Sequence, residues 1–268
     1  MIPGWSYRTP LTLLQDLGIT EPEEIDIEAI AQYCRATIQY KPLEGCQARI
    51  IGYGNRAIIA VSSSERRARQ RFSGAHELGH WMCDHNHISF SCSEKELATE
   101  WSKDNPERRA NRYAADLLLP EFMFRPRSKD RDITFDTVHD LASQFNMSLT
   151  ATAIRLVEFG SFPSIIVCND KNKLRWFSKD RDLPSAIRLR DRPGRATIAY
   201  DLLHGAESPG HPVDVYADSW IDREDADRYS IREDSIRISL RDGLTLVVSL
   251  LWWKDERQLL DLELQDET

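Results

Sequence analysis

Residues 71–80 have the sequence RFSGAHELGH, whose last five residues form an HExxH motif within a helical stretch. At about 3.6 residues per turn, His76 and His80 project from one face of a helix, so their imidazoles can bind one zinc ion together. Glu77 lies beside that ion without ligating it, where its carboxylate can move a proton from water to a leaving amine. The motif therefore predicts a zinc site with the residues of a hydrolase.

Composition is consistent with an intracellular globular protein. The chain has 268 residues, of which 41% are hydrophobic, enough for one larger domain and a smaller one. No run approaches the roughly 18 apolar residues of a membrane span, and residues 1–20 lack the basic start and apolar run of a signal peptide. Five cysteines, without CxxC pairs, favour reduced thiols. We expect a cytoplasmic protein without a membrane partner.

The charge of the chain argues against nucleic acid as a direct ligand. The formal net charge is −8, so the chain as a whole repels a phosphate backbone. One basic cluster precedes the motif, and we interpret it as a solvated face, with substrate docking as the alternative: Arg66, Arg67, Arg69 and Arg71.

The region before the motif predicts helices followed by a small sheet. Residues 1–36 have a helical pattern, in which Asp26 can cap a helix that runs to Cys34. Three short segments then predict an antiparallel sheet: Thr37–Tyr40, Ala48–Tyr53 and Arg56–Val61. An extended substrate can add to the edge of the last strand by main-chain hydrogen bonds, unless that strand is a structural edge alone. Residues 62–65 (SSSE) resemble a capping box, so the motif helix is expected to begin there and to end near Asp84.

A second helix is predicted from Pro106 to Leu119, before Pro120. Five residues share one face of this helix: Glu107, Ala110, Asn111, Ala114 and Leu118. The two alanines among them permit close approach to the motif helix. Glu107 is the expected third ligand, because a ligand on a helix holds metal geometry better than one on a loop. Two histidines and one carboxylate leave a fourth position open for water, and Asn111 can orient a ligand.

Other ligands stay open at this point. Less regular sequence contains four acids, Glu94, Glu96, Glu100 and Asp104, whereas Asp116 lies on another helical face. A second group could also reach the metal: Cys83, Cys92, His85 and His87. A thiolate ligand would occupy the water position and make the metal structural or switchable.

The two motifs together, RFSGAHELGH at 71–80 and ERRANRYAADLLLP at 107–120, resemble the ImmA/IrrE family of metallopeptidases. Gly74, Tyr113 and Leu119 depart from that family's pattern. The resemblance implies a zincin-like fold for about residues 25–160, zinc on His76, His80 and Glu107, and Glu77 as the catalytic acid/base. It also implies a protein substrate, a transcriptional repressor in a stress-response or mobile-element switch.

Residues 134–158 predict two helices joined by a turn at 146–148, the outline of a helix-turn-helix. The second helix carries one cation, Arg155, which is too little charge for phosphate anchoring. We therefore expect packing or partner contact, with DNA binding as the alternative.

Beyond residue 160 we expect a smaller, mostly β domain. One helix is predicted near Ala196–His204, and Asp242-Gly243 suits a hairpin turn. The predicted strands are Ser164–Cys168, Leu174–Phe177, Val213–Tyr216, Ser235–Leu240, Leu244–Trp253 and Leu259–Leu264. No chemistry can be assigned to these residues, so a regulatory or partner-binding role is the expectation.

The prediction is thus an α+β protein with a zincin-like metallopeptidase domain at 1–160 and a smaller domain at 161–268. Its expected function is that of a zinc metalloendopeptidase acting on a repressor. The alternative is a non-catalytic, zinc-stabilised regulatory module that binds the repressor without cutting it. The cleavage site, the activating signal and the oligomeric state are not predicted.

Overall fold

The computed structural model describes residues 6–84, 90–92, 105–184, 187–223, 225–239, 244–253 and 257–259. Helices and strands are both present, which confirms the α+β class. The chain divides into two compact units, residues 1–124 with 142–148, and residues 125–141 with 149–268. The predicted domain boundary after residue 160 stays a prediction. No helix in the described ranges is long and apolar enough to cross a membrane.

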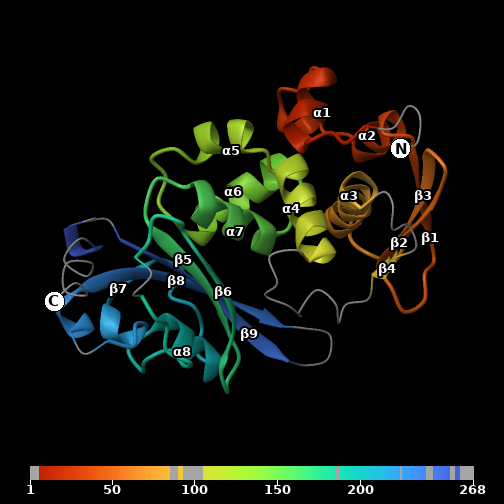
Figure 1. The fold of residues 1–268 in the computed structure, drawn as a ribbon. Helices are drawn as coiled ribbons and strands as arrows, with labels where there is room; N and C mark the ends of the chain where they lie inside the picture. Colours follow the sequence, from red (N-terminus) through yellow and green to blue (C-terminus); the bar gives the residue numbers. More distant parts are fainter. Residues whose placement is uncertain are drawn as a thin grey trace. The chain divides into compact units, whose positions relative to one another are not determined.

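The first unit contains a four-stranded sheet and its helices (Figure 1). Its elements, in chain order, are α1 (Pro10–Asp16), α2 (Ile27–Tyr33), β1 (Ala36–Lys41), β2 (Ala48–Tyr53), β3 (Arg56–Ser62), α3 (Arg67–Cys83), β4 (Phe90–Cys92) and α4 (Pro106–Leu118). The helix starts follow local signals, because the side chains of Thr9 and Asp26 cap α1 and α2. Asn105 caps α4 in the same way, and Pro106 occupies its first turn.

The sheet is mixed, with the order β1-β3-β2-β4. β2 pairs antiparallel with β3, as predicted, but β1 runs parallel to β3. β3 therefore has a neighbour on each side, and the prediction that substrate adds to its free edge is wrong. Its apolar sequence suits this central position, where Ala57 and the run from Ile59 to Ser62 are buried.

The motif helix begins later than predicted. β3 extends through Ser62, whose backbone amide donates to the Gln47 carbonyl at 2.8 Å, so the serine belongs to the sheet and caps no helix. α3 starts at Arg67 without a side-chain cap. Near its other end, the buried Trp81 indole donates to the Cys34 carbonyl at 2.8 Å and ties α3 to the end of α2.

The predicted helix-turn-helix outline is present. After α5 (Glu121–Ser128), α6 (Phe135–Phe145) leads through Asn146, which has a left-handed φ of 50°, into α7 (Leu149–Phe159). No residue of α7 is exposed. Arg155 is 2% exposed and pairs with Glu158 at 2.8 Å. The one cation of this helix is therefore directed into the protein, away from any phosphate backbone.

The second unit contains a five-stranded antiparallel sheet and α8 (Ile198–Leu203) (Figure 1). Its strands are β5 (Ser164–Asn169), β6 (Leu174–Lys179), β7 (Val213–Tyr216), β8 (Ser230–Ser239) and β9 (Thr245–Trp252), in the order β6-β5-β9-β8-β7. β8 and β9 pair as the predicted hairpin, whereas its Asp242-Gly243 turn lies outside the described residues. Of the predicted strand Leu259–Leu264, only Leu259 is described, and it is helical.

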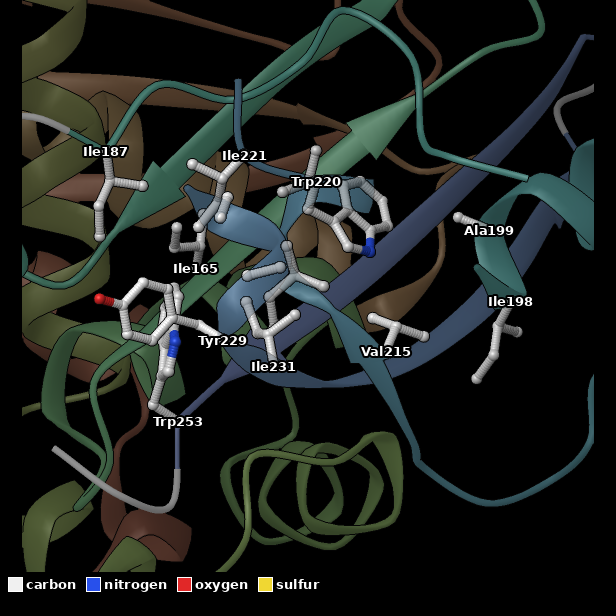
Figure 2. Close-up of a cluster of buried hydrophobic side chains, with 14 of the residues drawn as sticks. Ile165, Ile187, Ile198, Ala199, Val215, Trp220, Ile221, Tyr229, Ile231 and Trp253 are labelled. Carbon is white, nitrogen blue, oxygen red and sulfur yellow. The ribbon is translucent and has the colours of Figure 1, made fainter. Parts of the chain in front are cut away.

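One face of this sheet carries an aromatic core (Figure 2). Trp220, Tyr229 and Trp253 pack there with aliphatic residues of β5, β8, β9 and α8. Adjacent residues of β8 point to opposite faces of the sheet, so Glu233 shares the core face and Asp234 the other. Burial of each large apolar side chain contributes roughly 1.5–3 kcal/mol to folding.

Candidate metal centre

The centre is built where α3 and α4 approach most closely. A Cβ at Gly79 would lie 2.9 Å from both the Cα and the carbonyl oxygen of Ala110. No side chain fits at that distance from a backbone, so glycine here and alanine on α4 allow the two helices to pack together. Ala110, one of the two alanines that predicted close approach, therefore lies at the contact.

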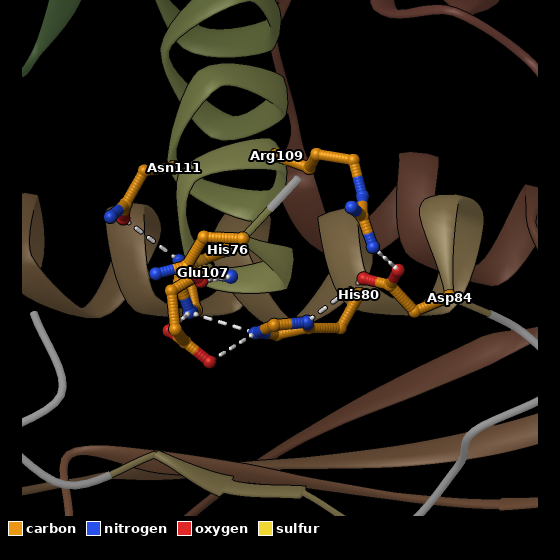
Figure 3. Close-up of polar contacts among 7 residues, drawn as sticks. His76, His80, Asp84, Glu107, Arg109 and Asn111 are labelled. Atoms are coloured by element: carbon orange, nitrogen blue, oxygen red, sulfur yellow. Dashed lines mark hydrogen bonds and ion pairs between the residues drawn. The ribbon is translucent and has the colours of Figure 1, made fainter. Parts of the chain in front are cut away.

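Three side chains converge from these helices (Figure 3). The Nε2 atoms of His76 and His80 are 3.2 Å apart. The two carboxylate oxygens of Glu107 each lie 3.1 Å from one of these nitrogens. These residues form a group that could hold a metal ion.

The outer ring nitrogens orient both histidines. Asn111 places Oδ1 2.9 Å from the Nδ1 of His76, and Asp84 places Oδ2 3.3 Å from the Nδ1 of His80. Because carboxylate and amide oxygens accept hydrogen bonds, each Nδ1 is the donor. The lone pairs of both Nε2 atoms then face the carboxylate of Glu107. Two imidazole nitrogens and a carboxylate that all accept and none of which donates require a positive charge between them.

The pKa of Glu107 reflects the same demand for positive charge. A proton on the Nε2 of either histidine would supply such a charge, because hydrogen bonds from His76 and His80 lower the pKa of Glu107 far below its ordinary value, although burial opposes the shift. A divalent cation would satisfy the demand more completely. Ligands about 2.0–2.1 Å from a tetrahedral ion lie roughly 3.3 Å apart. The 3.2 Å between the two Nε2 atoms fits that geometry, and each of these nitrogens lies 3.1 Å from a different oxygen of Glu107.

Two further buried carboxylates belong to α3 or its C-terminal end. Glu77, which follows His76 on α3, is wholly buried, and Asp84 is 6% exposed. Asp84 also accepts from the Arg109 guanidinium. Burying a carboxylate costs free energy unless positive charge offsets it, and Arg109 supplies that charge for Asp84.

Residues 31–157 match the model of the Peptidase M78 family, described as the IrrE N-terminal-like domain. This segment belongs to that family. This match confirms the expected ImmA/IrrE resemblance and zincin-like fold. The family is one of peptidases, and together with the three-residue group it suggests that the domain binds a metal ion.

Solved structures extend the likeness beyond the IrrE N-terminal-like domain. A Mycobacterium tuberculosis transcriptional regulator is similar with a TM-score of 0.60, over 90% of this chain and 73% of that chain. The two are 14% identical, so the likeness concerns the fold alone. No curated protein matches the chain significantly.

Two of the alternative ligands can be placed within the IrrE N-terminal-like domain. Cys83 lies outside the three-residue group, and burial, followed by the charge of Asp84, raises the pKa of its thiol to about 11. Asp116 pairs with Arg112 at 3.0 Å. The side chains of the remaining alternatives lie outside the described residues: His85, His87, Cys92, Glu94, Glu96, Glu100 and Asp104.

Sequence reasoning did not identify Asp84 and Arg109 at this centre. It used Asp84 only to mark the end of the helix, and Arg109 lies 25 positions further along the chain. The contact of Asn111 with His76 agrees with its predicted orienting position. One departure from the family pattern also has a structural reason, because the hydroxyl of Tyr113 donates to the Arg8 carbonyl at 3.0 Å.

Proposed function

We propose that this protein is a zinc-dependent endopeptidase. In this proposal His76, His80 and Glu107 hold the zinc, and Glu77 is the catalytic acid/base. The observation that carries it is the convergence of two imidazole nitrogens and a carboxylate, mutually 3.1–3.2 Å apart, in a domain of a peptidase family.

Each residue then has a defined task. Zinc, when bound, supplies a Lewis acid that polarises the scissile carbonyl and stabilises the charge that develops on its oxygen. Glu77 accepts a proton from the attacking water and passes it to the departing amide nitrogen. Asn111 holds the imidazole of His76 with Nε2 directed inward.

The substrate we propose is a protein, a transcriptional repressor, and the proposed compartment is the cytoplasm. The substrate follows from the ImmA/IrrE resemblance, and the compartment from five cysteines without CxxC pairs, which favour reduced thiols. The chain's net charge of −8 supports a partner other than nucleic acid. The burial of Arg155 supports the same view, because α7 then has no cation to offer a phosphate backbone.

Glu77→Gln tests the catalytic role. The amide keeps the size of the side chain but cannot accept the proton, so cleavage of a purified candidate repressor should slow by about 10²- to 10⁴-fold. The metal content and repressor affinity of the variant should equal those of the wild type. Cleavage sites are identified by mass spectrometry of the products.

The same experiment separates catalysis from sequestration. If the wild type binds the repressor and relieves repression without cutting it, and Glu77→Gln does the same, the protein is the zinc-stabilised binding module instead. Repressors encoded beside the gene are the first substrates to test.

A further inference from the structure

Asp84 occupies an unfavourable position for an acid. It is the C-terminal capping residue of α3, where the helix dipole presents its negative end. Its side chain is also 4% exposed, so water does little to stabilise the charge. A carboxylate retained there must be stabilised by specific partners.

Two described partners provide this stabilisation from opposite sides (Figure 3). Oδ2 lies 3.3 Å from the Nδ1 of His80, and Oδ1 accepts from the Nη2 of Arg109. Arg109 follows Glu107 by two residues on α4. A single carboxylate therefore joins the second histidine of α3 to the helix that carries the third ligand.

The two histidines are supported by different chemistry. His76 donates to the neutral amide of Asn111, which is itself on α4. His80 donates to a carboxylate, and a carboxylate makes an imidazole more electron-rich than an amide does. Both outer nitrogens thus depend on α4, His76 directly and His80 through Asp84 and Arg109.

We infer that Asp84 is the positioning residue for His80, and that Arg109 acts on the metal centre by holding Asp84. The inference rests on the proposed metal site and adds two residues to it. The pair fixes the ring orientation of His80 and the distance between the C-terminal turn of α3 and the first turn of α4.

Asp84→Asn changes this contact with little change in shape. Asparagine has one accepting oxygen, so it can satisfy either His80 or Arg109, while its NH₂ group faces the other donor. The imidazole of His80 then loses either its hydrogen bond or its fixed orientation. Substitution of such a partner lowers metal affinity by about 10- to 100-fold.

The primary experiment measures the Zn²⁺ dissociation constant of the full chain by competition with a chromophoric chelator. Asp84→Asn is expected to raise it by at least about 10-fold. The matched control is Asp116→Asn, which removes an acid of α4 from its 3.0 Å pair with Arg112 and should leave the constant unchanged. Co²⁺ absorption bands should shift in position and intensity for Asp84→Asn only, a change that lost fold stability alone does not produce.

Arg109→Gln tests whether the arginine acts through Asp84. Alone, it should raise the Zn²⁺ dissociation constant by less than Asp84→Asn does. In the Asp84→Asn background it should cause no further loss, because the amide is then free to turn its oxygen toward His80. If the losses of Zn²⁺ affinity caused by the two substitutions instead add in the double variant, the role assigned to Arg109 is wrong.

The inference and the proposed function fail in different ways. If the wild type binds Zn²⁺ tightly and Asp84→Asn matches both its dissociation constant and its Co²⁺ spectrum, the positioning role is wrong and the metal site stands. If the wild type binds neither ion, the proposed function itself is wrong.

Discussion

Gly79 illustrates how a residue that the HExxH pattern leaves unspecified is fixed by packing. It lies against the Ala110 backbone of α4, one residue before His80. The pattern requires only that histidines recur four residues apart, whereas the third ligand requires a second helix within reach. A side chain at position 79 would force α4, and Glu107 with it, away from the two histidines.

We therefore predict that Gly79→Ala weakens metal binding and stability together. Overpacking of this kind costs roughly 1–3 kcal/mol of unfolding free energy, which urea denaturation measures, and chelator competition measures the loss of Zn²⁺ affinity. Gly74→Ala is the matched control on the same helix. Its Cβ would lie 3.1 Å from the movable end of Ile38, and its next neighbours, Ile27 and Val61, would be at the ordinary contact distances of 3.8 and 3.9 Å. Equal Zn²⁺ affinity in both variants would contradict the account.

Residues of the centre differ in how far the sequence predicts them. His76, His80 and Glu107 follow from helical spacing and from two recognisable motifs. Asp84 does not, because a polar residue at a helix end is usually a solvated cap, and nothing near it in the chain identifies Arg109 as its partner. A contact between residues 25 positions apart depends on how two helices pack, which local pattern does not encode.

At the scale of elements, local signals were accurate wherever no partner competed with them. The Asn105 cap and Pro106 fixed the start of α4. The SSSE segment failed because its first serine is held in β3 by a backbone hydrogen bond to Gln47. The central place of β3 and the parallel direction of β1 arise from pairing between strands, and periodicity within one strand is the same in either arrangement.

α8 illustrates an element that depends on a distant residue. A helix of six residues is marginal by itself. Glu233 of β8 accepts from the Ala199 amide at 2.7 Å, and also from the Ser235 hydroxyl and the Trp220 indole. This wholly buried carboxylate therefore fastens the start of α8 to the sheet.

Glu233→Gln should destabilise the protein by about 1–3 kcal/mol, because the NH₂ group of the glutamine would face a donor from which the carboxylate now accepts a hydrogen bond. Burial raises the pKa of Glu233, so the folded protein binds this proton more tightly than the unfolded chain. Wild-type stability from this group is greatest below its unfolded pKa of about 4.3 and falls as pH rises through the folded pKa.

Glutamine does not titrate, so the stability gap between wild type and Glu233→Gln should narrow from pH 4.5 to pH 7.5. Denaturant titrations of both metal-free proteins, followed by tryptophan fluorescence, measure the gap. The pKa of Asp234 is raised as well, but this residue is present in both proteins, so its contribution cancels in the difference between their unfolding free energies. A gap that widens with pH would mean that the folded protein favours the carboxylate.

At the scale of the whole molecule, the proposed chemistry belongs to one of the two units. The first holds the metal-binding group and most of residues 31–157, the segment that matches a peptidase family. The second contributes an aromatic core and an antiparallel sheet. Short apolar runs in the sequence predicted most of the strands of this second unit. Its sequence contains no motif comparable to HExxH, so no reaction could be predicted for it.

The central claim is that His76, His80 and Glu107 together bind one zinc ion. Its most direct test is the metal content of the purified chain by elemental analysis after dialysis against excess Zn²⁺ and gel filtration. We predict about one zinc per chain for the wild type and for Cys83→Ser, and less than about one tenth for His80→Ala and Glu107→Gln. Full zinc content in His80→Ala and Glu107→Gln, or its loss in Cys83→Ser, would contradict this site.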